Sequence, residues 1–316
     1  MKIAPRRLAG LPLMLVIALG CAQNADSNVK LKGAPQIPDS PEGTVLAVAH
    51  AIHDGHPEIL WTALPESYQA DLVELTQAFA EKVDPTLYDR GFALVMRAAE
   101  VLDDRKEVIL ASETFTSTGA DADEIRTALA NTQAVTAILK ESQVATVAGL
   151  STIDWEQFLA TTGAKLIDTA STIDAGETDN PLGDLESLTV ETIENNGDRA
   201  TLRISSADHE PEDVEMVRVE GRWVPARMAD QWPQFVEDTR QGLAKMTPEN
   251  MAAQKTQIMM FFGMADGLIE QIASLQTPEE FDAAIGPMLA PFMGAASTGM
   301  EDDEARTDDE TEEPEE

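Results

Sequence analysis

Three of the chain's four histidines fall within seven residues, in the order His-Ala-Ile-His-Asp-Gly-His. His50 and His53 would lie one helical turn apart on one face, a spacing at which two imidazoles can bind the same metal ion. Asp54 or His56, just past the expected helix end, could add a third ligand. The alternative is a solvated helix end, where histidine interacts favourably with the helix dipole. Because the sequence indicates no distant fourth ligand, we predict no metal site, and these histidines are kept only as a metal hypothesis.

Methionine is the second residue type with chemistry to consider, since its thioether can bind Cu(I). Methionine also fills irregular helical cores and lines adaptable binding surfaces. The spacing around residues 259–262 (Met-Met-Phe-Phe) favours core packing, and a face for a protein partner on the C-terminal helices is the second interpretation. Eight of the 13 methionines lie late in the chain, at Met246, Met251, Met259, Met260, Met264, Met288, Met293 and Met300.

Sequence motifs of enzymes are missing. There is no Gly-x-Ser-x-Gly, no His-Glu-x-x-His, no glycine-rich phosphate loop and no Cys-x-x-Cys. The acidic stretches Asp121–Glu124 and Asp174–Asp184 do not have the spacing of an EF-hand, and aspartate at a helix start explains them more simply. We therefore predict no catalytic residues and no cofactor.

The chain begins with the pattern of an export signal. Lys2, Arg6 and Arg7 form a basic start, and an uninterrupted apolar run follows from Leu11 to Leu19. This run is shorter than the roughly 20 residues that a membrane-spanning helix needs. We therefore predict that residues 1–20 are a signal peptide.

Cys21 is the only cysteine, and it stands at the expected cut site. The residues Ala-Leu-Gly-Cys that end there resemble the lipobox of bacterial lipoproteins. This resemblance implies cleavage between Gly20 and Cys21 and a thiol that carries lipid, with acyl chains such as palmitate. Ala22 then implies the periplasmic face of the outer membrane. Ala18 and Gly20 also satisfy the rule for ordinary signal-peptidase cleavage, which would leave a soluble periplasmic or secreted protein.

Acidity dominates the composition. With 22 Lys and Arg against 57 Asp and Glu the net charge is −35, and removal of the three signal-peptide cations takes it to −38. The segment Glu301–Glu316 carries −10 of this, so the folded body is acidic as well. Such a charge repels phosphate groups, which argues against nucleic-acid binding. It favours solubility, and a lone cysteine allows no internal disulfide.

Apolar residues at helical spacing predict a helical region before residue 174. Ser40 followed by Pro41 predicts an N-cap and first helical residue, and Asp154 predicts another cap. The predicted helices are Pro41 to about Gly55, Pro65 to Val83, Thr86 to Leu102, Ile125 to Val147, and one after Asp154. Their expected inward residues include Val45, Val48, Ile52, Tyr68, Leu72, Leu75, Phe79, Tyr88, Phe92, Val95, Ala99, Ile125, Leu129 and Leu139.

The hydrophobic period changes from 3.6 to 2 after Asp174–Asp184, a stretch rich in glycine, proline and acids. Residues 187–225 predict an antiparallel meander of three or four strands with turns at Asn195–Asp198 and Glu220-Gly221. Helical spacing then returns. The expected later elements are helices at Ala229–Met246 and Thr247–Leu275, and a capping box at Thr277–Glu280 before a last helix.

Two stretches, Pro41–Leu64 and Val219–Pro225, resemble the ends of NTF2-like or cystatin-like modules. That resemblance implies a curved sheet packed on helices, with room for a pocket. We predict an α+β fold, mainly helical, with one antiparallel meander between two helical regions. The predicted segments are a signal peptide (1–20), a lipid anchor and tether (21–39), a helical region (40–173), a meander with C-terminal helices (185–293) and a disordered acidic tail (296–316).

These features favour a lipid-anchored envelope protein that binds or scaffolds a partner without catalysis. Its expected partners are the membrane, through the N-terminal lipid, and a protein, through the methionine-rich helices; nucleic acid is not expected. The alternative is an NTF2-like module that binds a ligand or a metal and acts as a hydrolase. The oligomeric state and the specific ligand do not follow from the sequence.

Lipidation gives a direct prediction for Cys21. Two or three acyl chains contribute about 0.8 kcal/mol per buried methylene, which is enough to hold a protein on a bilayer. We expect wild-type protein to partition into detergent and the Cys21→Ser variant to remain in the aqueous phase, as followed by phase separation and intact mass. Recovery of wild-type protein in soluble form with an unmodified Cys21 would establish ordinary cleavage instead.

Overall fold

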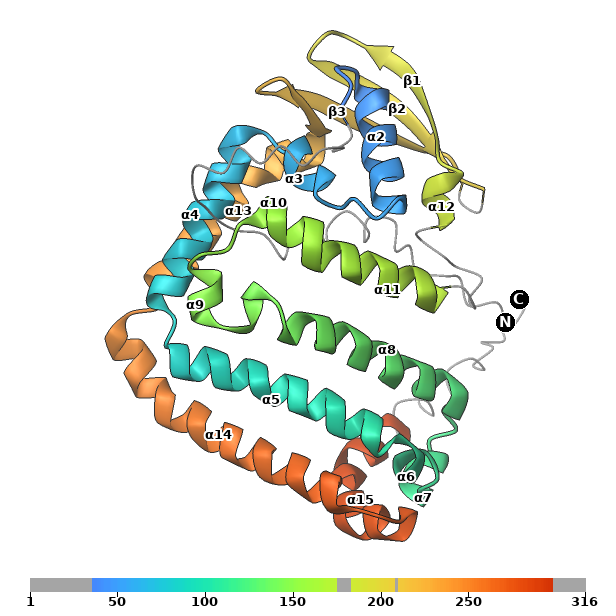
Figure 1. Ribbon diagram of the computed structural model, residues 1–316, viewed down its shortest axis with the longest axis vertical. Coiled ribbons are helices and arrows are strands. Elements are labelled where there is room, and N and C mark those ends of the chain that lie inside the picture. The colour runs from blue at the N-terminus through green and yellow to red at the C-terminus, as the bar shows by residue number, and fades with distance from the viewer. Residues whose placement is uncertain (1–35, 175–182, 208–209, 298–316) are drawn as a thin grey trace, which may run out of the picture. The chain divides into compact units, whose positions relative to one another are not determined.

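The computed structural model describes residues 36–174, 183–207 and 210–297. The described chain is mainly helical, with one antiparallel sheet between two helical regions of the sequence (Figure 1). The predicted α+β fold class is therefore confirmed. Contacts divide the chain into two compact units. Unit 1 takes the residues up to Met96 and Asn131–Met264, and unit 2 takes Arg97–Ala130 and the residues from Ala265 onward.

Helices make up most of both units. Before the sheet they are α2 (Pro41–His53), α3 (Ile59–Ala63), α4 (Glu66–Lys82), α5 (Pro85–Asp104), α6 (Lys106–Leu110), α7 (Glu113–Thr116), α8 (Ala122–Lys140), α9 (Val147–Leu150), α10 (Trp155–Phe158), α11 (Ala164–Asp174) and α12 (Gly183–Glu186). A 3₁₀ turn at Gln143–Ala145 precedes α9, and a π-helical turn at Leu159–Gly163 joins α10 to α11. After the sheet come α13 (Ala226–Ala244), α14 (Pro248–Ser274) and α15 (Pro278–Ser297).

The sheet is a four-stranded meander in the order β1-β2-β3-β4. Its strands are β1 (Thr189–Asn195), β2 (Arg199–Ser205), β3 (Glu212–Val219) and β4 (Arg222–Pro225). Gly197 and Gly221 lie in the first and last turns with φ of 86° and 80°. Glycine adopts these left-handed angles without the penalty of a Cβ. Both predicted turns are confirmed.

One face of the sheet packs on α2 (Figure 1). The buried side chains of this cluster are Ala200, Leu202, Met216 and Trp223, and Val45 of α2 packs against them. Residues that are paired across antiparallel strands share a face, which places Ala200 with Met216. The Thr192 hydroxyl of β1 also donates to Glu42 of α2 at 2.9 Å.

A larger hydrophobic core in unit 1 joins α4, α9, α10 and α13. Tyr68 of α4 stacks on Trp232 of α13 with ring centroids 4.0 Å apart. The Tyr88 hydroxyl of α5 donates to the carbonyl of Val144 at 2.7 Å. The buried members of this core are Tyr68, Leu72, Val73, Leu75, Ala80, Val144, Val147, Leu150, Ile153, Trp155, Phe158, Trp232, Val236 and Leu243.

Unit 2 has a smaller core of its own, in which Leu275, Phe281 and Ile285 are buried. Val108 and Ile109 of α6, which are half-buried, pack against these residues. The guanidinium of Arg105 donates through two nitrogens to the carbonyl of Ala273, at 2.9 and 2.7 Å. This contact satisfies a carbonyl at the C-terminal end of α14, where the helix leaves its last carbonyls unpaired.

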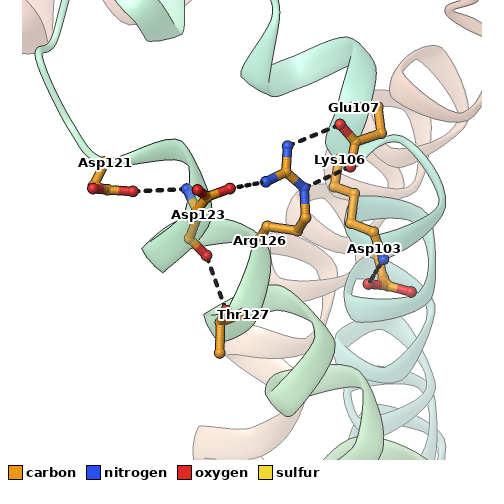
Figure 2. A network of polar contacts seen from close by, with 7 residues as sticks. All are labelled: Asp103, Lys106, Glu107, Asp121, Asp123, Arg126 and Thr127. Carbon is orange, nitrogen blue, oxygen red and sulfur yellow. Dashed lines mark hydrogen bonds and ion pairs between the residues drawn. The ribbon is translucent and has the colours of Figure 1, made fainter. Parts of the chain in front are cut away.

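Polar contacts join α6 to α8 on the surface of unit 2 (Figure 2). The Arg126 guanidinium donates to both carboxylate oxygens of Glu107, at 2.7 and 3.0 Å, and also to Asp123. The bidentate hydrogen bond from Arg126 lowers the pKa of the Glu107 carboxyl below its ordinary value. Because these groups are exposed, water and salt screen the network, and it orients the helices more than it stabilises them.

Helix caps are the best-predicted local features. The Ser40 hydroxyl accepts from the N–H of Gly43 at 3.2 Å, and Asp154 accepts from the N–H of Gln157 at 2.9 Å. At the start of α15 the Thr277 hydroxyl accepts from the N–H of Glu280 at 3.3 Å. The Glu280 carboxylate accepts in return from the N–H of residue 276, one residue earlier than in a standard capping box.

Several predicted buried faces are wrong. Val95 is 58% exposed, because the buried side of α5 is formed by Leu94, Met96 and Ala99. The helix expected to reach Val147 ends at Lys140, and none of its residues is buried. In α2 the buried residues are small ones, Pro41, Thr44, Ala49 and Ala51, while Val48 and Ile52 are half-buried.

Some predictions fall outside the described residues. They concern the signal peptide, Cys21, the tether as far as residue 35, most of Asp174–Asp184 and the tail from residue 298. The predicted segment boundaries at 40–173 and 185–293 stay predictions. Among the described residues, no helix has the length and hydropathy needed to cross a membrane.

Asp282 gives a pH-dependent prediction for unit 2. Its carboxylate accepts from the backbone N–H groups of Thr114 and Glu113, at 2.8 Å each. Hydrogen bonds from Thr114 and then Glu113 lower the pKa of Asp282 below its ordinary 3.8. A depressed pKa contributes stability above the unfolded value and loses it as the pH falls through the folded value. We expect hydrogen-exchange protection of the Thr114 amide to hold at neutral pH and to fall under acid conditions.

Asp282→Asn should lose this protection at neutral pH. Glu279→Gln, on the same turn of α15, is the control and should leave the protection unchanged. An NMR titration that gives Asp282 a pKa at or above 3.8 would contradict the assignment of these hydrogen bonds.

Candidate functional site

The three clustered histidines do not converge in the structure. His50 is exposed on α2. His53 Nδ1 lies 3.2 Å from Asp54, and its Nε2 lies 3.9 Å from Glu186 of α12. His56 Nδ1 instead lies 3.0 Å from Glu58. Within the described ranges there is no group of three or more His, Cys, Asp or Glu that could hold a metal ion.

Glu58 is the one acidic residue among the buried polar side chains of the described chain, with 5% of its surface exposed. Its carboxylate pairs with the His56 imidazole, which is half exposed. A buried carboxylate needs such a partner, because an unpaired charge is costly away from water. This pair orients one imidazole, but among the described residues no serine, threonine or cysteine side chain hydrogen-bonds to that imidazole, and the Thr62 hydroxyl donates to the backbone carbonyl of Glu58 instead.

The first acidic stretch caps a helix. The Asp121 carboxylate accepts from the backbone N–H of Asp123 at 2.8 Å (Figure 2) and from the backbone N–H of Glu124 at 3.2 Å. These N–H groups begin α8 and have no partner within the helix. The carboxylate oxygen is therefore used by the backbone, as the capping interpretation of the sequence predicted.

The most exposed large hydrophobic side chains of the described residues lie on α14. Met260, Phe261 and Met264 are 64%, 63% and 68% exposed. We call these three residues the α14 face. They are spaced by one, three and four positions, so they share one side of the helix. The core-packing interpretation of this segment is wrong for Met260 and Phe261, while Met259 and Phe262 are half-buried.

The opposite side of α14 is attached to α5. The Phe262 ring lies against Gly91, where a Cβ would come within 3.1 Å of Cζ. Lys255 Nζ lies 2.5 Å from the Asp84 carboxylate just before α5. The hydrogen bond from Lys255 lowers the pKa of Asp84 below its ordinary value. The helix is thus held by one side and presents the α14 face on the other.

The α14 face lies in an uncharged part of a highly acidic chain. No acid occurs between Glu249 and Asp266, although an average stretch of that length would carry about three. The single charged residue in the stretch is Lys255, which is paired with Asp84. Because residues 250–265 contain no acid, another molecule can cover this face without burying a carboxylate from the same stretch of helix.

A partly open cavity of about 180 Å³ lies beside the β3–β4 hairpin in unit 1. Its lining includes Asp39, Thr44 of α2, Ala63 of α3, and Arg218 and Trp223 of the hairpin. None of the three clustered histidines lines it. The NTF2-like resemblance implies room for a pocket near the sheet, and Thr44, Ala63 and Trp223 fall in the two stretches quoted for it, but the residues that line the cavity were not predicted.

Comparison with known proteins found no protein-family model, no curated protein and no solved structure that matches this chain. The resemblance to NTF2-like and cystatin-like modules therefore stays a prediction.

Two neighbouring phenylalanines test the description of α14. Phe261→Ala should change the free energy of unfolding by no more than about 0.5 kcal/mol, as expected for an exposed position. Phe262→Ala should cost on the order of 2 kcal/mol, because a half-buried ring loses part of the contacts of a core phenylalanine. Urea denaturation of the two variants measures this difference. Equal costs would mean that Phe261 is also packed, and that the α14 face is not free.

Proposed function

We propose that this protein is a lipid-anchored binding protein of the bacterial envelope that holds a partner protein on the α14 face. One observation carries the proposal: Met260, Phe261 and Met264 are each about two-thirds exposed on one side of a helix. Methionine and phenylalanine on a surface favour adaptable contact with an apolar partner. Among the described residues, the clustered histidines and the acidic side chains do not come together in a shared site, so binding is better supported than hydrolysis.

The size of the α14 face favours a small partner element. Its three side chains expose on the order of 400 Å², whereas a stable interface buries about 800 Å² on each side. A second copy of the chain, pairing through this face alone, would fall short of that area. A single amphipathic helix from another protein fits better, since it needs only a few apolar anchors at spacings of three and four.

Backbone geometry on α14 also suits a helical partner. Nothing lies within 4 Å of the position that a Cβ would take on Gly263, which is exposed beside Met264. Ala252 and Ala253, earlier on the helix, are exposed and small. Small residues let a second helix approach closely, and the larger anchors then pack around its side chains.

Charge selects among amphipathic partners. A chain with a net charge of −35 repels acidic proteins and accelerates its encounter with basic ones. The α14 face itself is uncharged, so lysines and arginines of the partner would lie outside the apolar contact and be attracted by the net negative charge of the chain. The proposed partner is therefore a basic amphipathic helix.

The N-terminal sequence supports the envelope location. A basic start, an apolar run and a single cysteine at its end fit a signal peptide and a lipidated Cys21. Ala22 favours transfer to the outer membrane, with the folded body on the periplasmic side. Ordinary cleavage would give the same binding protein as a soluble periplasmic or secreted form.

Binding of defined peptides tests the function. The Cys21→Ser chain is titrated into a labelled amphipathic peptide of leucine and lysine, and into a scrambled peptide of the same composition. We expect the amphipathic peptide to bind at least tenfold more tightly, as measured by fluorescence anisotropy. Met264→Glu should remove that preference, because it places a charge at the centre of the apolar contact.

Ile193→Glu is the matched control, since Ile193 is 47% exposed on β1, away from α14. It adds the same negative charge, which alone would strengthen the attraction of a basic peptide. Equal binding of the scrambled peptide would reduce the interaction to net charge and refute the proposal. Concentration-dependent dimers that Met264→Glu abolishes would identify a second copy as the occupant instead.

A further inference from the structure

Eight methionines have side chains that the structure describes, and they differ widely in exposure. Met96 of α5 and Met216 of β3 are buried, at 5% and 3% exposed. The half-buried ones are Met228, Met246, Met251 and Met259. Met260 and Met264 are the two exposed ones, at 64% and 68%. The exposed methionines of the described residues therefore coincide with the α14 face.

Exposure decides how readily a methionine reacts with an oxidant. The thioether sulfur is the nucleophile, so the oxidant must reach it, and a side chain enclosed by the core keeps the oxidant away. With hydrogen peroxide, the sulfur attacks one oxygen and the O–O bond breaks. The products are methionine sulfoxide and water. The sulfur loses two electrons and the peroxide gains them, so no further reactant is needed.

Net charge favours an uncharged oxidant. A chain of −35 repels anionic oxidants such as peroxynitrite, whereas hydrogen peroxide is neutral and approaches without that repulsion. Residues 250–265 contain no acid, and Lys255, the one charged residue among them, is paired with Asp84. A hydroperoxide is therefore the class of oxidant that suits this face.

Oxidation would change the chemistry of the contact and leave the core intact. A thioether is apolar and adaptable, whereas a sulfoxide carries a polar oxygen that accepts hydrogen bonds. Met260 and Met264 are four positions apart, so both oxygens would appear on one side of α14. The apolar side of a partner helix would remove water from these oxygens without supplying donors. Because both side chains lie outside the core, the packing of the fold would not change.

We propose that Met260 and Met264 are a reversible oxidation site through which a hydroperoxide releases the partner from the α14 face. This inference rests on the proposed binding function and adds its regulation. A methionine sulfoxide reductase reverses the step: the sulfoxide and two thiols give the thioether, a disulfide and water. The same exposure that admits the oxidant leaves both sulfoxides open to such an enzyme.

Oxidation rates test the site without any partner. The Cys21→Ser chain, which has no thiol, is treated with hydrogen peroxide and followed by peptide mass spectrometry. We expect Met260 and Met264 to gain oxygen at least tenfold faster than Met96 and Met216. The urea midpoint should stay unchanged when the exposed pair is oxidised. Comparable rates at all four methionines would overturn the proposal, as would unfolding that accompanies oxidation of the pair.

Binding before and after peroxide treatment tests the regulation. The amphipathic peptide of leucine and lysine is titrated into each chain in reduced and oxidised form, and each chain is compared with itself. We expect oxidation to weaken binding at least tenfold in the Cys21→Ser chain, and less than twofold once Met260→Leu and Met264→Leu are added. Leucine keeps a similar apolar volume and has no sulfur to oxidise. Met251→Leu with Met259→Leu is the matched control, because it removes two half-buried methionines from the same helix and should leave the tenfold loss in place.

The binding function and its regulation fail in different ways. A reduced chain without preference for the amphipathic peptide would refute the binding function, and the regulation falls with it. Equal binding by the reduced and oxidised chains would refute the regulation alone. Equal losses in the two leucine pairs would assign the effect to other methionines and overturn the proposal as well. Reductases for both sulfoxide epimers should restore the original affinity of the oxidised chain, and a permanent loss would contradict a reversible site.

Discussion

The stacking of Tyr68 on Trp232 is the contact on which unit 1 depends. The two rings lie 4.0 Å apart and within 6° of parallel, and they join α4 to α13 across more than 160 residues of sequence. The indole N–H of Trp232 donates to Asp71 at 3.0 Å, and Arg240 pairs with Asp71 and Glu74 beside it. Burial of the ring raises the pKa of the Tyr68 hydroxyl. Stacked rings with a satisfied polar edge both bury area and fix orientation.

This contact carries weight because the chain is poor in aromatic residues. It has two tyrosines and four tryptophans, and both tyrosines with three of the tryptophans lie in the main core. Packing there overrides local preference: Pro233 follows Trp232 inside α13, although proline removes a helical hydrogen bond. The fourth tryptophan, Trp223, lies in the sheet cluster, and α13 begins directly after its strand. Chain continuity thus ties the cavity beside Trp223 to the stacked pair.

The sequence pattern predicted the helices, strands and turns better than it predicted which of their faces are buried. Caps at Ser40 and Asp154 and turns at Gly197 and Gly221 follow from local chemistry, and the change of period located the sheet. Burial was harder, because apolar spacing indicates that a helix has a face without saying what covers it. The spacing of apolar residues on α14 fits a buried helix face and an exposed one equally well. The resemblance to NTF2-like modules implied a pocket near the sheet, but its lining could not be predicted, since it joins Asp39 to Arg218 across 179 residues and depends on strand register.

Net charge constrains how the proposed binding on the α14 face can be made. A chain of −35 imposes a long-range field that attracts basic molecules and repels anions, whatever the local site. Recognition under such a field requires a contact that does not itself depend on charge. The α14 face makes it with uncharged side chains, and the field then sorts partners by their flanking charge. Specificity therefore arises where the acidic surface is interrupted.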